Sequence, residues 1–236
     1  FRAQMLEALE LSNADHVYAI EHGTKSSTLK AMPVNVGPLI RARVINRCKT
    51  VIATSATVAT GKGGGFGYMK SELGANGFRT LSAESPFDWK TQARGIVLKA
   101  APEPNSERFA EYTGRALAAA VKRTQGRTLG LFTSYRALDA AYEYLGELDL
   151  PYRVLKQGDM PRSKLIEAFK EDVSSVLLGT ESFWTGVDVP GQALSCVFID
   201  RLPFPHPDDP LLRAIESKSE DAFRTYSIPR AILSFK

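Results

Sequence analysis

An apolar run that ends in a polar loop is the feature that most limits what this chain can fold into. Val176, Leu177 and Leu178 are followed by Gly179 and then by the hydroxyl, aromatic and turn residues of the segment 180–192. A buried parallel strand has this composition because both of its faces are covered. The loop after such a strand lies at the carboxyl edge of the sheet, where α/β proteins bind ligands. The segment therefore predicts an α/β fold with a binding site at this edge.

Strands and helices alternate through the second half of the chain. A helix is expected to open at Ser106 and Glu107 and to end at Gly126. Further strands are predicted at 128–132, 152–155, 176–178 and 195–199, and further helices at 135–148 and 162–170. This alternation is typical of a mostly parallel sheet with helices on both faces.

The first hundred residues are predicted to hold shorter elements. These are a helix within 1–13, a hairpin formed by 17–20 and 29–32, a helix within 36–48, a buried strand at 50–54 and a short strand at 95–99. The Gly-rich segment 60–67 has the composition of a flexible hinge. We therefore place a domain boundary there, with one domain at 1–60 and a second at 61–236.

Composition limits the class of protein. The chain has 236 residues, and 30 Lys and Arg against 26 Asp and Glu give a formal net charge of +4, which is compatible with a nucleic-acid partner without demonstrating one. The two cysteines, Cys48 and Cys196, are expected to be buried free thiols, and two are too few for a four-cysteine metal or iron–sulfur site. No apolar run reaches the ~18–20 residues of a membrane span and no secretory leader is seen, so we expect a cytoplasmic protein. Both ends look cut, which predicts a fragment.

A phosphate-binding P-loop is the first chemical site to test against the sequence. Such a loop needs Gly, four residues, and then Gly-Lys-Ser or Gly-Lys-Thr. The nearest match starts at Gly64 and has Met69, Lys70 and Ser71 at its end. Methionine replaces the second glycine, and its Cβ obstructs the tight curl of backbone around phosphates. We therefore expect this chain alone not to hold ATP firmly.

Two further groups of hydroxyls follow predicted strands. Residues 54–57 read Thr-Ser-Ala-Thr and follow the strand at 50–54, where an ordinary hydroxyl-stabilised turn is the alternative interpretation. Thr133 and Ser134 follow the strand at 128–132. Ser134 could simply cap the next helix, although a helix N-terminus also favours a phosphate.

A metal site is not favoured. His206, Asp208 and Asp209 lie among prolines, which is typical of a rigid solvated loop. A metal-dependent hydrolase that uses Asp188, Asp200, Asp208 and Asp209 is a third hypothesis, but these residues have no ordered ligand spacing.

Several of these segments resemble the DinG/XPD-like superfamily 2 DNA helicases. Residues 179–191 resemble motif V, Gly-Thr-x-Ser-Phe-Trp-Glu-Gly-Val-Asp-x-Pro-Gly, and 200–204 match the following Asp-Arg-Leu-Pro-Phe. Thr185 departs from the pattern because the family usually has Glu there. Residues 54–57 resemble motif III, and 131–138 resemble motif IV, Leu-Phe-Thr-Ser-Tyr-x-x-Leu. Gln157 and Gly158 resemble the family's Gln-Gly element.

The resemblance implies a RecA-like motor. Residues 1–60 would be the closing part of motor lobe one, and 61–236 would be motor lobe two, truncated before motif VI. The intact parent would be an ATP-dependent 5′→3′ DNA helicase that hydrolyses ATP with Mg²⁺ at the cleft between the lobes and moves along single-stranded DNA. The Walker A loop, the Asp-Glu-x-His box and motif VI are absent from this chain, so the fragment alone is expected to be inactive as an ATPase.

The resemblance also implies roles for individual residues. Gly186 and Asp188 would face the ATP cleft. Thr54, Ser55, Ala56 and Thr57 would couple the two lobes. DNA contacts would come from Thr133, Ser134, Tyr135, Gln157, Thr180, Ser182 and Trp184. Trp184 would stack on a base or, as an equal alternative, pack as a core residue beneath the loop.

The rival hypothesis from another class is a non-catalytic α/β module that binds nucleic acid or acts as a scaffold. The sequence also leaves the biological pathway open between DNA repair, a mobile element and a CRISPR-associated system.

Overall fold

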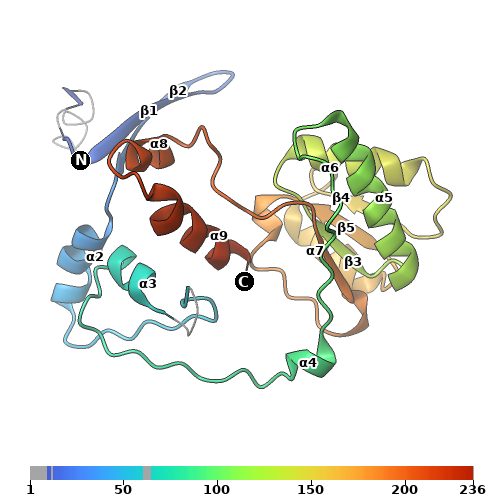
Figure 1. The fold of residues 1–236 in the computed structure, drawn as a ribbon, viewed down its shortest axis with the longest axis horizontal. Helices are drawn as coiled ribbons and strands as arrows, with labels where there is room; N and C mark the ends of the chain where they lie inside the picture. Colours follow the sequence, from blue (N-terminus) through green and yellow to red (C-terminus); the bar gives the residue numbers. More distant parts are fainter. Residues whose placement is uncertain (1–9, 12, 61–64, 236) are drawn as a thin grey trace. The chain divides into compact units, whose positions relative to one another are not determined.

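The computed structural model describes residues 10–11, 13–60 and 65–235 (Figure 1). The contacts within the chain divide it into two compact units. One unit combines Phe1–Glu84 with Phe204–Lys236, and the other is Ser85–Pro203. This division by contacts is separate from the predicted division by helicase lobe at residue 60, which stays a prediction.

The unit Ser85–Pro203 is built on a four-stranded parallel sheet with the order β4-β5-β3-β6. The strands are β3 (Thr128–Leu131), β4 (Val154–Lys156), β5 (Val176–Gly179) and β6 (Cys196–Ile199). The longer helices are α5 (Glu107–Thr124), α6 (Tyr135–Gly146) and α7 (Arg162–Glu171), with the short α4 (Trp89–Gln92), η2 (Glu181–Phe183) and η3 (Gly191–Ala193). The predicted parallel α/β architecture is therefore confirmed.

Two apolar cores cover the two faces of this sheet, and alternate residues of β5 enter different cores. Val176 and Leu178 pack in one core with buried residues of α5 and α6. Leu177 packs in the other core with Leu165 and Phe169 of α7. All three strand residues are fully buried. The continuous apolar run noted in the sequence thus reflects burial on both faces, as a central parallel strand requires.

Helix α5 ends where a glycine is needed. Gln125 adopts a left-handed backbone with φ of 56°, and Gly126 follows with φ of 81°. A Cβ on Gly126 would lie 1.7 Å from the carbonyl oxygen of Ser174. The predicted end of this helix at Gly126 is confirmed, and the close approach of Ser174 adds a packing reason that the sequence does not show.

The other unit contains the predicted hairpin and several short helices. β1 (His16–His22) pairs antiparallel with β2 (Ser27–Pro33). The helix predicted within 36–48 is present as α2 (Gly37–Arg43) followed by the 3-10 turn η1 (Ile45–Arg47). The remaining elements are α3 (Gly67–Glu72), α8 (Pro210–Glu216), the π-helix η4 (Phe223–Ser227) and α9 (Ile228–Phe235). None of the helices in the described part of the chain is long and apolar enough to cross a membrane.

Two predicted strands are wrong. Residues 50–54 and 95–99 are irregular, and Ile52 and Val97 are 83% and 84% exposed. A strand is stable only when a neighbour satisfies its backbone hydrogen bonds, and neither segment has a paired neighbour among the described residues. Cys48, predicted to be buried, is exposed beside the first of these segments, whereas Cys196 is partly buried in β6.

Two further predictions fall on residues whose structure is not described. The predicted helix within 1–13 lies almost wholly outside the described residues, as does the centre of the predicted hinge at 61–64.

Candidate nucleic-acid interface

In the unit Ser85–Pro203, the carboxyl ends of the four parallel strands bring candidate site residues to one edge of the sheet. Thr133 follows β3, Gln157 follows β4, Thr180 follows β5 and Asp200 follows β6. These residues are far apart in sequence, and only the parallel pairing of the strands places them together. We call this set of strand-end loops the carboxyl edge.

Gln157 links three parts of the carboxyl edge. Its side-chain oxygen Oε1 accepts hydrogen bonds from the backbone N–H of Thr180 at 2.7 Å and from its hydroxyl at 3.1 Å. Its amide nitrogen Nε2 donates to the hydroxyl of Tyr135 at 2.6 Å. Thr180 is only 7% exposed, whereas Tyr135 is 57% exposed. Both donors of Thr180 are thus satisfied inside the protein, while the Tyr135 ring stays accessible.

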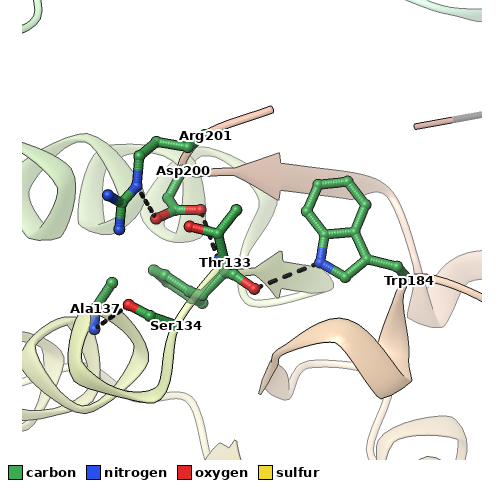
Figure 2. A network of polar contacts seen from close by, with 7 residues as sticks. Thr133, Ser134, Ala137, Trp184, Asp200 and Arg201 are labelled. Carbon is green, nitrogen blue, oxygen red and sulfur yellow. Dashed lines mark hydrogen bonds and ion pairs between the residues drawn. The ribbon is translucent and has the colours of Figure 1, made fainter. Parts of the chain in front are cut away.

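The loop after β3 is tied to the end of β6. Figure 2 shows the backbone N–H of Thr133 donating to Oδ1 of Asp200 at 3.1 Å, and the Nε of Arg201 donating to Oδ2 at 3.1 Å. In the same loop Ser134 caps α6 by accepting from the N–H of Ala137 at 3.2 Å. The alternative interpretation of Ser134 as a helix cap is therefore confirmed, and the hydroxyl-bearing Thr133 beside it is exposed.

Asp200 is a functional candidate whose only role predicted from the sequence was that of a metal ligand, although it also begins the Asp-Arg-Leu-Pro-Phe match. Its side chain has no exposed surface, and this burial raises the pKa of its carboxyl even though Arg201 and the Thr133 N–H favour the charged form. Arg201 lies over the ring of Phe109 at 5.4 Å. The signal that could have identified Asp200 is its position, which is the first residue after β6 at the same edge as Thr133.

Trp184 belongs to the loop that follows β5 and packs against the core. Its indole N–H donates to the backbone oxygen of Phe132 at 3.4 Å, as Figure 2 shows, and its ring packs against the core that contains Leu129 and Leu177. This geometry agrees with the core alternative for Trp184. Stacking on a base stays a prediction.

The other predicted site residues of this loop lie at the surface. Ser182, Gly186 and Asp188 are all exposed. Gly186 has a φ of 67°, a left-handed conformation that glycine adopts without strain. Arg162, which the sequence gave no reason to single out, contacts the backbone of this loop.

Residues 54–57 belong to the other unit and form an irregular segment. Thr54, Ser55 and Ala56 are exposed, and the N–H of Thr57 donates to the hydroxyl of Ser55 at 3.2 Å. The hydroxyl-stabilised turn expected as the alternative for this motif is therefore present. Its coupling role stays a prediction.

The aspartates near His206 act in local structure. Asp209 caps α8 by accepting from the N–H groups of Leu211 and Leu212, and Asp208 pairs with Arg213. Within the described residues, no three His, Cys, Asp or Glu side chains are grouped so that they could hold a metal ion. The metal-dependent hydrolase hypothesis therefore gains no support from this part of the chain.

Comparison with known proteins gives a consistent family. The family described as helicase C-terminal domain matches residues 117–236. The chain is 40% identical over 223 residues to the ATP-dependent helicase DinG of Mycobacterium tuberculosis, which covers 90% of this chain and 32% of the relative. It is 31% identical over 241 residues to the ATP-dependent DNA helicase YoaA of Escherichia coli, covering 100% of this chain and 37% of the relative.

A third relative carries a different name. The 3′-5′ exonuclease DinG of Bacillus subtilis is 33% identical over 228 residues, which is 91% of this chain and 24% of the relative. The chain thus spans about a third of the length of these relatives, or less. The family match covers half of the chain and includes every strand of the parallel sheet and the carboxyl edge. The chain therefore belongs to the family of helicase C-terminal domains that occurs in ATP-dependent helicases of the DinG and YoaA type.

Proposed function

We propose that this chain is part of an ATP-dependent DNA helicase that couples ATP hydrolysis to 5′→3′ movement along single-stranded DNA. The observation that carries this proposal is the carboxyl edge, where a chain of the helicase C-terminal domain family presents polar groups from several strand-end loops. The name of the YoaA relative supports DNA as the nucleic acid. The polarity follows only from the resemblance to DinG/XPD-like helicases.

In this proposal the exposed groups of the carboxyl edge hold the DNA backbone. Thr133 and Ser182 are exposed on loops after β3 and β5, and the hydroxyls there would donate to phosphate oxygens. Such contacts position a strand without reading its sequence. Thr180 and Gln157 bond to each other, so their part is to hold the shape of the edge. The exposed ring of Tyr135 is better placed than Trp184 to stack on a base.

The ATP cleft is assigned to the far end of the loop after β5. Gly186 and Asp188 are exposed there, and they would contact the ribose of the nucleotide or the arginine finger that binds the γ-phosphate. ATP phosphates and Mg²⁺ need a P-loop and an acidic box. This sequence lacks both motifs. The rest of the helicase would therefore supply them. Residues 54–57 would couple the binding and hydrolysis of ATP to the strength of DNA binding.

Two single variants test the separate assignments in the whole helicase. Ser182→Ala should weaken single-stranded DNA binding by about 1–2 kcal/mol, roughly 5- to 30-fold, for every sequence. The slope of affinity against salt should stay the same because no cation is lost. Asp188→Ala should lower the kcat for ATP by about 10²–10³-fold with nearly normal DNA affinity.

Ser195→Ala is the matched control, because Ser195 is an exposed hydroxyl at the opposite end of β6. It should change neither quantity. The absence of DNA-stimulated ATP hydrolysis in the whole wild-type helicase would contradict the proposed function. If Ser182→Ala lowered the kcat for ATP and Asp188→Ala weakened DNA binding, the DNA and ATP assignments of the loop would be reversed. Strand displacement from 5′- and 3′-overhang duplexes decides the polarity.

A further inference from the structure

The guanidinium of Arg162 binds three backbone carbonyls of the loop after β5. Its Nε donates to the oxygen of Ser182 at 3.0 Å, and its Nη2 donates to the oxygens of Thr185 at 2.8 Å and Gly186 at 3.0 Å. Arg162 is the first residue of α7, about twenty residues before the loop that it binds. One side chain thus joins the start of a helix to most of residues 182–186, which we call the β5 loop.

The same guanidinium lies against an anchored ring. The Cζ of Arg162 is 5.4 Å from the ring centroid of Phe183, and Phe183 is 1% exposed. Phe183 also sits directly on Gly179, where an added Cβ would lie 2.5 Å from its Cγ. The root of the β5 loop is therefore fixed in the core, and Arg162 holds the exposed part that continues from it.

The chemistry of the contact favours arginine over lysine. A guanidinium offers several N–H donors in a rigid plane, whereas a lysine ammonium is a compact point charge on a flexible stem. No ion pair joins Arg162 to a carboxylate in the described ranges of the chain, so its donors serve the loop carbonyls. Hydrogen bonds from a charged donor are shorter and stronger than neutral ones, which suits the anchoring of an exposed loop.

Residues at both ends of the connection between β4 and α7 therefore form hydrogen bonds with the segment after β5. Gln157 begins this connection and binds Thr180. Arg162 follows the connection as the first residue of α7 and binds three carbonyls of the β5 loop. Ser182 is assigned above to DNA, and Gly186 and Asp188 are assigned to ATP. The two side chains that flank this short connection therefore bind both the part of the loop assigned to DNA and the part assigned to ATP.

We propose that Arg162 is a positioning residue that fixes the β5 loop so that its DNA-facing and ATP-facing ends keep one arrangement. The catalytic part of this inference rests on the proposed function, whereas its structural part does not. Loss of Arg162 should therefore lower DNA affinity and ATP turnover together. This differs from the separate losses expected for Ser182→Ala and Asp188→Ala.

The structural part is tested with Trp184, which lies within the β5 loop. The chain has two tryptophans, so Trp89→Phe leaves Trp184 as the only fluorophore of this kind. In that background, Arg162→Gln should raise the acrylamide quenching of Trp184, because the freed loop exposes the indole. Arg162→Lys keeps the charge and the stem and should give an intermediate value. Arg115→Gln is the control, since the one polar contact of Arg115 among the described residues is an exposed pair with Glu111 on α5.

The catalytic part is tested in the whole helicase with the same variants. Misplacement of a reacting group by about 1 Å can cost on the order of 100-fold in rate, so Arg162→Gln should lower kcat by about 10- to 100-fold while the KM for ATP changes little. The affinity for single-stranded DNA should fall in parallel. Arg162→Lys should recover part of both, and Arg115→Gln should leave both unchanged.

The outcomes separate the two ideas. Unchanged quenching of Trp184 in a folded Arg162→Gln chain overturns the positioning role. If Arg162→Gln does not fold, the Arg162→Lys chain decides the same question, and wild-type quenching and kcat in that variant also overturn the role. Increased quenching together with a wild-type helicase that shows no DNA-stimulated ATP hydrolysis supports the loop contact and contradicts only the proposed function.

Discussion

Removal of the Gln157 side chain should loosen the end of β5 more than any other single polar change at the carboxyl edge. In Gln157→Ala the backbone N–H of Thr180 loses an acceptor at 2.7 Å, and the Thr180 hydroxyl loses one at 3.1 Å. Thr180 is 7% exposed, so water replaces these partners poorly. The third bond, to the hydroxyl of the exposed Tyr135, is easily replaced by water.

The free-energy cost of Gln157→Ala depends on the burial of the Thr180 N–H that loses its acceptor. A buried donor that loses its partner costs about 1–3 kcal/mol, whereas an exposed hydrogen bond contributes at most about 1 kcal/mol. If the cost falls on the local opening that exposes the Thr180 amide, hydrogen exchange there should accelerate by about 5- to 150-fold. Tyr135→Phe, which removes only the exposed partner, should accelerate it by less than about 5-fold.

Amide hydrogen exchange at Thr180, followed by NMR, is the assay because it reports a single site without a global unfolding curve. Gln157→Glu is the matched variant. Its carboxylate keeps an oxygen that can accept both hydrogen bonds from Thr180, and the Tyr135 hydroxyl can donate to the other oxygen. Exchange in Gln157→Glu should therefore stay near that of the wild type at neutral pH. Equal acceleration in Gln157→Ala and Tyr135→Phe would refute the reasoning, and so would no acceleration in either.

Two further predictions concern packing and pH. Gly126→Ala should lower the free energy of unfolding by more than about 2 kcal/mol in urea titrations, because it combines a φ of 81° with a Cβ 1.7 Å from Ser174 O. Gly146→Ala, in the last turn of α6 with no atom near the added Cβ, should instead stabilise by about 0.5–1 kcal/mol; equal effects would contradict the argument. Burial raises the pKa of Asp200 above its ordinary value of 3.8, so the folded state favours the protonated carboxyl. The contribution of Asp200 to stability is therefore fully present below pH 3.8 and is lost as pH rises through the raised pKa. The free energy of unfolding of the wild type minus that of Asp200→Asn should fall across this window, and a flat or rising difference would overturn the assignment.

The sequence by itself determined the elements of the parallel sheet. An uninterrupted apolar run predicted β5, and the alternation of strands and helices predicted β3, α5, α6 and α7, all of which the structure contains. These signals are local, because the spacing of apolar residues within a segment predicts which face of the strand or helix is buried. The hydroxyls after β3 and β5 were noted in the same way, whereas the roles of the motif residues were predicted from the resemblance to helicases.

The tertiary structure decided which of those residues form hydrogen bonds with one another. Thr180 and Gln157, both predicted to contact DNA, form hydrogen bonds with each other, and Asp200 accepts from the Thr133 amide across 67 residues of sequence. Arg162 gave no signal because its acceptors are backbone carbonyls, which every residue has. Residues 50–54 and 95–99 have the composition of strands and yet no partner among the described residues. A local pattern encodes which surface a segment must bury, whereas a hydrogen-bond partner depends on the register and loop geometry that bring distant segments together.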